Sequence, residues 1–125
     1  MPDASSPKTI LVADDDKRVT LLLKERLEEE GYRTLTARDG EEALELVHAR
    51  RPDLVLLDVS MPRLDGDQVY MELKANVATK HIPVLILTGL RSDEEIAAAH
   101  DDDMLAKPVN FEVLFRKIRE RIGHK

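Results

Sequence analysis

Acidic side chains follow two apolar runs, at the points where buried strands are expected to end. The stretch "ILVADDDKR" places Asp14, Asp15 and Asp16 directly after one run, and "LVLLD" ends in Asp58. Carboxylates about 4 Å apart repel by roughly 4 kcal/mol at an effective dielectric constant of about 20, so folding alone does not favour gathering them. Magnesium relieves such repulsion, because it prefers carboxylate oxygens and also shares phosphate oxygens. If the fold brings these residues together, the pattern indicates a magnesium site.

The rest of the sequence alternates between strand and helix patterns. The apolar runs that predict strands are Thr9–Ala13, Arg33–Ala37, Leu54–Asp58, Pro83–Thr88 and Met104–Lys107. In the first helical pattern we expect Val19, Leu22, Leu23 and Leu27 to face inward, and Gly31 to end the helix. Further helices are predicted from Asp39-Gly40 to Pro52, around Asp67–Asn76, around Ser92–His100, and from an Asn110 cap to Ile122.

Five strands that alternate with helices predict an α/β fold, a doubly wound five-stranded parallel sheet with helices on both faces. Right-handed crossovers place the carboxyl ends of all strands at one edge, where ligands bind. With a strand order of 2-1-3-4-5, Asp14, Asp15 and Asp58 share one pocket at that edge. Thr88 and Lys107 end the fourth and fifth strands at the same edge.

Composition limits the classes of function. A chain of 125 residues suits one domain, and we expect a disordered tail over residues 1–7 and the domain over residues 8–125. The net charge of −6 argues against direct nucleic-acid binding, and the absence of cysteine excludes thiolate metal sites. Apolar runs of about five residues are too short to span a membrane, and "MPDASSPK" is not a signal peptide, so we expect a cytoplasmic protein.

Four motifs, in this order and at strand ends, carry a family resemblance. They are the acidic pair after the first strand, "DVSMPRLDG" at the third, "PVLILTG" at the fourth and "KP" after the fifth. From about Lys8 to Ile122 the chain resembles the receiver domain of two-component response regulators, the CheY-like family with a flavodoxin-like fold.

The resemblance implies a metal site for magnesium or manganese. Asp15 matches the direct metal ligand, and Asp14 matches the acidic partner that acts through water. Asp58 matches the phospho-accepting aspartate, which also faces the metal, and Ser60 matches the residue that offers a backbone carbonyl.

The resemblance also implies how the phosphoryl group is handled. Asp58 would be the nucleophile, Thr88 the hydroxyl that reaches for the phosphoryl group, and Lys107 the cation that pairs with it. Lys107-Pro108 matches a peptide bond that is cis in the family. Such a domain catalyses its own phosphorylation and dephosphorylation but is a signalling module rather than a conventional enzyme.

The implied partners are proteins. A sensor histidine kinase or a phosphotransfer protein would supply the phosphoryl group from a phosphohistidine, and an unknown downstream protein would read the result. The signal would pass through the face built from the fourth helix, fifth strand and fifth helix. We expect a monomer or weak dimer, with no contact to nucleic acid or membrane.

Two other functions fit parts of the pattern. A receiver-like module could bind a partner without phosphorylation. A haloacid-dehalogenase-type phosphatase would use Asp14 as nucleophile and Asp16 as acid, but the acidic pair expected after Lys107 and a cap are missing. We interpret Asp16 as a surface residue that caps the first helix.

The chain also departs from the family pattern. Between Thr88 and Lys107 it is shorter by about three residues, close to one helical turn. Met104 stands where the family has an aromatic residue. Both changes fall on the expected signalling face, so we expect a short fourth helix and a switch without the usual aromatic motion.

Overall fold

The computed structural model describes residues 7–58, 66–88, 104–106 and 109–123. The strands are β1 (Thr9–Ala13), β2 (Arg33–Ala37), β3 (Leu54–Asp58), β4 (Val84–Thr88) and β5 (Met104–Ala106). The helices are α1 (Lys17–Glu29), α2 (Gly40–Arg50), α3 (Gly66–Ala75) and α5 (Phe111–Ile122).

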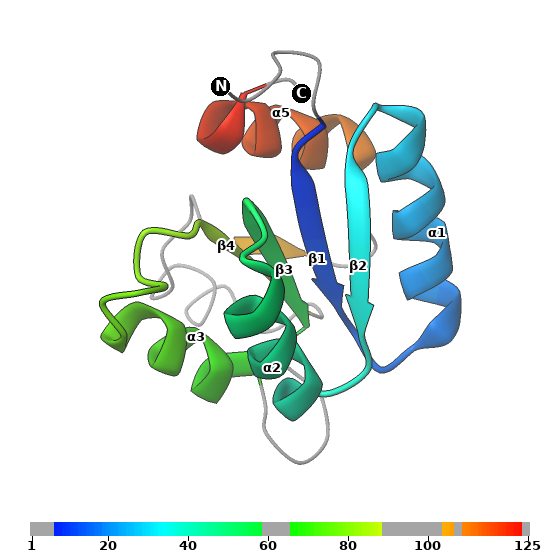
Figure 1. The fold of residues 1–125 in the computed structure, drawn as a ribbon. Coiled ribbons are helices and arrows are strands. Elements are labelled where there is room, and N and C mark those ends of the chain that lie inside the picture. Colours follow the sequence, from blue (N-terminus) through cyan, green and yellow to red (C-terminus); the bar gives the residue numbers. More distant parts are fainter. Residues whose placement is uncertain (1–6, 59–65, 89–103, 107–108, 124–125) are drawn as a thin grey trace.

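The strands form one parallel sheet in the order β2-β1-β3-β4-β5, which confirms the predicted fold class and strand order. The order reverses between β1 and β3, since β1 pairs with β2 on one side and with β3 on the other. β1, β2 and β3 run downward in Figure 1, and because every pairing is parallel, the carboxyl ends of the strands share one edge of the sheet. The residues that follow β1 and β3 therefore meet at that edge.

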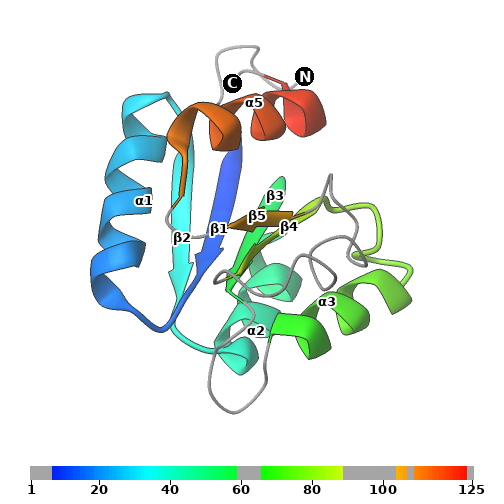
Figure 2. The same ribbon diagram turned by 180° about the vertical axis from the view of Figure 1, so that it is seen from behind.

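Two apolar layers hold the helices against the sheet. On one face, Ile10, Val12, Leu54 and Leu56 pack with residues of α1 and α5. On the other face, alternate strand residues such as Leu11 and Val55 pack with α2 and α3. Figures 1 and 2 show these two pairs of helices on opposite sides of the sheet. β3 is buried along its whole length, which explains why its sequence reads as an unbroken apolar run.

Polar caps define where the helices begin and end. The side chains of Asp16, Asp39 and Asn110 accept hydrogen bonds from backbone N–H groups in the first turns of α1, α2 and α5. Gly31 follows α1 with φ of 95°, a conformation that favours glycine. The predicted helix starts at Asp16, Asp39 and Asn110 and the glycine stop at Gly31 are confirmed.

Some sequence expectations were wrong. Leu22 does not face the core but is 49% exposed, because the buried stripe of α1 is centred on Leu23 and Leu27. Arg26 takes the place beside α5, where its guanidinium lies 4.1 Å from the ring centre of Phe111.

Other expectations fall on residues outside the described ranges. These are the disordered tail expected over residues 1–7, apart from its last residue, together with the helix around 92–100, residue Ser60 and the Lys107-Pro108 bond. β4 begins at Val84, one residue later than expected. Among the described helices, none is long and apolar enough to cross a bilayer.

Candidate functional site

Three carboxylates meet at the carboxyl edge of the sheet. One oxygen from each of Asp14, Asp15 and Asp58 lies within 4.8 Å of the others. Asp14 and Asp58 are only 2% and 3% exposed, whereas Asp15 is open to solvent. Burial strengthens the repulsion between like charges, because it removes the water that screens them. The predicted meeting of these residues is confirmed.

The sheet register places Asp14 beside Asp58. Ala13 pairs with Leu57, so the next residue on each strand leaves the sheet at the same level. On the other side of β3, Asp58 pairs with Leu87 of β4, and Thr88 follows Leu87 at the end of β4. The backbone of Thr88 therefore lies at the predicted edge, while its side chain lies outside the described residues, as do Ser60 and Lys107.

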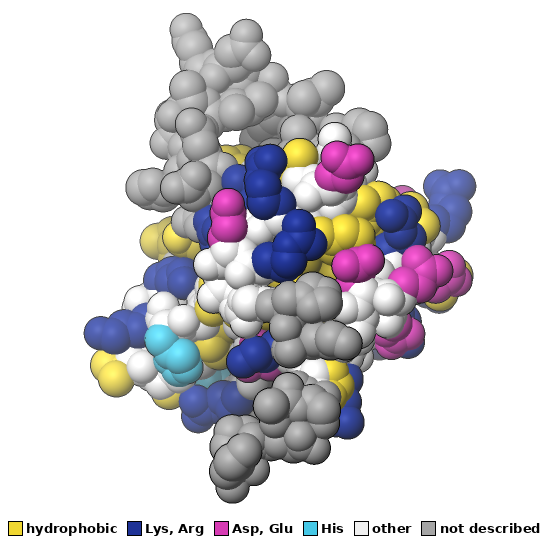
Figure 3. All heavy atoms as spheres, turned by 90° about the horizontal axis from the view of Figure 1, so that it is seen from above, with side chains coloured by type: hydrophobic (Ala, Val, Ile, Leu, Met, Phe, Trp, Pro, Cys, Tyr) yellow, Lys and Arg dark blue, Asp and Glu magenta, His cyan; other side chains and the backbone are white. Residues whose placement is uncertain are grey.

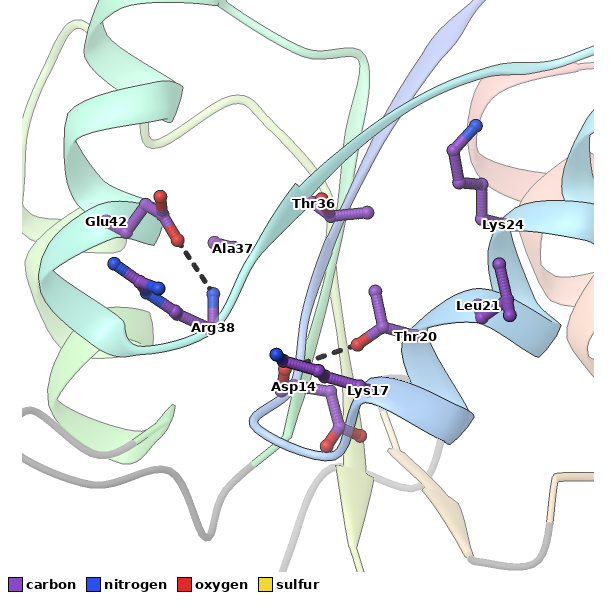
Figure 4. Close-up of a pocket in the computed structure, with 9 residues that line it drawn as sticks. All are labelled: Asp14, Lys17, Thr20, Leu21, Lys24, Thr36, Ala37, Arg38 and Glu42. Carbon is purple, nitrogen blue, oxygen red and sulfur yellow. Dashed lines mark hydrogen bonds between the residues drawn. The ribbon is translucent and has the colours of Figure 1, made fainter.

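Hydrogen bonds to β2, to α1 and within the turn hold Asp14 in place, and Figure 4 draws the one from Thr20. Its backbone N–H donates to the carbonyl of Ala37 at 3.0 Å, which extends the pairing of β1 with β2 by one residue. Its own carbonyl accepts from the Thr20 hydroxyl at 3.2 Å, and its Oδ1 accepts from the Asp16 N–H at 2.9 Å. Asp14 is thus fixed from β2, from α1 and from within the turn.

Sequence reasoning did not find Thr20 as part of this arrangement. Its hydroxyl reaches back from the first turn of α1 to the strand end, as Figure 4 shows. A threonine in a helix gives no periodic signal for such a bond, because the partner depends on how the turn folds. Asp16, by contrast, caps α1 as predicted, with Oδ1 accepting from the Arg18 N–H at 2.9 Å. That role does not suit the acid of a phosphatase, which would have to face its substrate.

The set of donors suits a hard cation. The cluster consists of carboxylates, with no histidine, and the chain has no cysteine. Such oxygen ligands are typical of magnesium sites rather than zinc sites. The residues therefore fit the cation that the sequence indicated.

A hollow of about 470 Å³ adjoins Asp14 and lies between α1 and the end of β2 (Figure 4). Lys17, Lys24 and Arg38 lie around it, together with Leu21. Asp14 lines the hollow as well as belonging to the carboxylate cluster, so the two features adjoin.

A doubly wound parallel sheet with a carboxylate cluster at its switch point defines the class of this protein. The family profile described as the response regulator receiver domain matches residues 10–119. The chain belongs to this family, as its motifs had indicated.

Similar proteins agree with this assignment. The response regulator MprA of Mycolicibacterium vanbaalenii is 43% identical over 116 residues, which are 90% of this chain and 49% of that protein. MprA of Mycobacterium leprae is 43% identical over 113 residues, with 88% of this chain and 49% of that protein covered. The chain thus spans about half the length of these relatives.

Solved structures of receiver domains superpose closely. The response regulator receiver domain protein of Clostridium thermocellum gives a TM-score of 0.81 at 32% identity, over 92% of this chain and 94% of that one. The receiver domain of the sensor histidine kinase PA1611 from Pseudomonas aeruginosa gives 0.84 at 30% identity, over 94% and 99%. The PA1611 structure has a magnesium ion coordinated in its active-site cleft.

Proposed function

We propose that this receiver domain accepts a phosphoryl group on Asp58 from a phosphohistidine of a sensor histidine kinase or phosphotransfer protein. The observation that carries the proposal is the cluster of Asp14, Asp15 and Asp58, in which two buried carboxylates lie within 4.8 Å of a third. Receiver domains of response regulators interact with such phosphodonors, and family membership therefore supports the choice of partner.

The chemistry is a transfer between two nucleophiles. A carboxylate oxygen of Asp58 attacks phosphorus, an acyl phosphate O–P bond forms, and the N–P bond to the donor imidazole breaks. The electron pair of that bond goes to the imidazole nitrogen, which takes a proton from solvent. Asp58 suits this role because its backbone is fixed: it pairs with Leu87 of β4 and directly follows Leu57, which pairs with Ala13 of β1.

Asp14, Asp15 and Asp58 would hold a magnesium or manganese ion, with the backbone carbonyl of Ser60 as a further ligand. When bound, the ion would offset negative charge on the carboxylates and on the phosphoryl oxygens. The hydrogen bonds from Thr20 and Asp16 keep Asp14 in position for this. The magnesium ion in the PA1611 receiver domain supports the same arrangement here.

Thr88 and Lys107 complete the proposed site. The Thr88 hydroxyl would donate to a phosphoryl oxygen, and the Lys107 ammonium would pair with the charge that the group brings. Thr88 is the last residue of β4 and pairs with Ala106 of β5, and Lys107 directly follows Ala106, so both come at the same edge of the sheet. Phosphorylation would then change the face formed by the fourth helix, β5 and α5, where Met104 replaces the usual aromatic residue. The downstream partner would bind there.

Intact mass spectrometry tests the proposal. Incubation with acetyl phosphate and magnesium should add about 80 Da, the mass of one phosphoryl group. Asp58→Asn or a chelator should abolish the gain. Asp16→Asn is the matched control, because asparagine can still cap α1 and the gain should remain. A gain that persists in Asp58→Asn would refute Asp58 as acceptor, and no gain in the wild type would favour a module that binds without phosphorylation.

A further inference from the structure

A second hollow lies at the opposite edge of the sheet, where the strands begin. Its volume is about 430 Å³, within the range of small-molecule sites. It is built from the residues that precede β1, β3 and β4 and from the last turn of α5. The carboxylate cluster is at the other end of the strands, so the two sites do not share residues.

Basic side chains surround this hollow, although the whole chain carries a net charge of −6. Lys8, Arg51 and Arg121 line it together with His81, and the facing acid in the lining is Asp53. Figure 3 looks onto this edge and shows Lys and Arg side chains across the middle of the face. The local charge is thus opposite in sign to that of the protein, a condition that favours an anionic ligand.

Arg51 is held ready for such a ligand. Its guanidinium Nη1 donates to the carbonyl of Ala78 at 3.0 Å, and its Nε donates to that of His48 at 3.4 Å. Within the described parts of the chain, neither Arg51 nor Lys8 forms an ion pair with a carboxylate. A guanidinium fixed by carbonyls loses little freedom when it binds an anion, and its planar donors match phosphate oxygens.

The acid among the described lining residues is turned toward the backbone. Asp53 Oδ2 accepts a hydrogen bond from the Thr9 N–H at 2.7 Å, a bond that ties the start of β3 to the start of β1. The carboxylate therefore has a structural partner of its own, and the described lining still holds more basic than acidic side chains.

The remaining wall is apolar. Pro52, Pro83 and Ile122 line the hollow, and the first two are rigid rings at the starts of β3 and β4. A site with an apolar wall and a few convergent cations suits a ligand with an organic body and an anionic group.

We propose that this hollow binds an organic phosphate of nucleotide size. The phosphate lies among Lys8, Arg51 and Arg121, and the organic part packs against Pro52, Pro83 and Ile122. Binding is independent of the phosphorylation proposed for Asp58, since the two sites occupy opposite edges of the sheet.

Titration of the full chain with ADP, followed by amide chemical shifts in a chelator, tests this proposal. ADP should shift the amides of Thr9, Asp53 and Ile82 and leave those of Asp14 and Asp58 unchanged. Lys8→Gln and Arg51→Gln should each weaken ADP binding by about tenfold, the usual effect of losing a charged hydrogen bond. Lys24→Gln is the control: it removes the same charge on α1 and should leave the affinity unchanged.

Four comparisons decide the ligand class. Adenosine should bind more weakly than ADP, and Asp58→Asn should bind ADP as the wild type does. Equal weakening by Lys24→Gln would reduce the effect to general charge attraction and overturn the proposal. A short single-stranded oligonucleotide that binds more tightly than ADP would also overturn it, because the phosphate would then come from a nucleic-acid backbone.

Discussion

Carboxylates have opposite effects on stability at the two edges of the parallel sheet. At the carboxyl edge, Asp14, Asp15 and Asp58 face one another within 4.8 Å. At the amino edge, Asp53 accepts a backbone N–H at 2.7 Å and lies among cations. One carboxylate thus stabilises the strand pairing, whereas the cluster opposes the fold until a cation joins it. The same residue type ties two strands together at one edge and forms the candidate metal site at the other.

The largest expected effect is on Asp53. Asp53→Ala should lower the free energy of unfolding by about 2 kcal/mol, because the Thr9 N–H loses a charged acceptor. Chemical denaturation would measure the change. Asp53→Asn keeps an acceptor oxygen and should lose much less, so equal losses in both variants would show that the hydrogen bond is not the cause.

Magnesium should act only at the carboxyl edge. At a free concentration tenfold above its dissociation constant, it should stabilise the protein by about 1.4 kcal/mol, provided that the unfolded chain binds none. Thermal melting with magnesium and with a chelator measures this. Asp58→Asn should lose the stabilisation and Asp53→Asn should keep it. Identical melting with and without millimolar magnesium in the wild type would contradict the metal site.

Asp15→Asn should stabilise the metal-free protein, a sign opposite to that at Asp53. Removing one charge relieves repulsion from Asp14 and Asp58 by about 1 kcal/mol, because Asp15 is exposed and water screens it. The same variant should weaken magnesium binding. Asp16→Asn, outside the cluster, provides the comparison for melting in a chelator. If Asp15→Asn melts lower than the wild type, the cluster is not under strain.

The smallest effect concerns Tyr32, whose hydroxyl donates to the Gly123 carbonyl at 3.3 Å. Burial raises the pKa of this phenol above 10.0; Arg119 lowers it in part, and Glu30 raises it further. Below pH 10 the phenol is protonated in both the folded and the unfolded protein. Tyr32→Phe should therefore lower the free energy of unfolding there by only about 0.5 kcal/mol. Above pH 10 the unfolded chain loses its proton first, and the wild type should lose stability faster than Tyr32→Phe. Parallel pH curves of unfolding free energy would contradict this.

Much of the fold and of the carboxylate cluster was predictable from the sequence. Apolar runs set the five strands, and the strand order places Asp14, Asp15 and Asp58 together, because parallel strands share their carboxyl edge. The cap at Asp16 followed from side-chain chemistry that acts within a few residues. Local patterns of this kind carry their own signal in the sequence.

Contacts across the fold were not predictable. Nothing in the sequence distinguishes Thr20 as the partner of the Asp14 carbonyl, or Arg51 as a residue with φ of 48° whose side chain bonds to Ala78. Leu22 was expected to face inward because hydrophobic periodicity alone does not show which side of a helix packs against the rest of the protein. Such details depend on how elements dock, and so the basic hollow at the amino edge appeared only in the structure.

The pairing of β1 with both β2 and β3 also has a kinetic consequence. Every ladder among the described strands is parallel, so each pairing must close a long crossover before it gains a contact. Asp14 and Asp58 come close only when β1 and β3 have paired. A cation bound between them would therefore stabilise the pairing of β1 with β3. It would slow unfolding more than it speeds folding. Occupancy of the site would then set how long the folded state lasts.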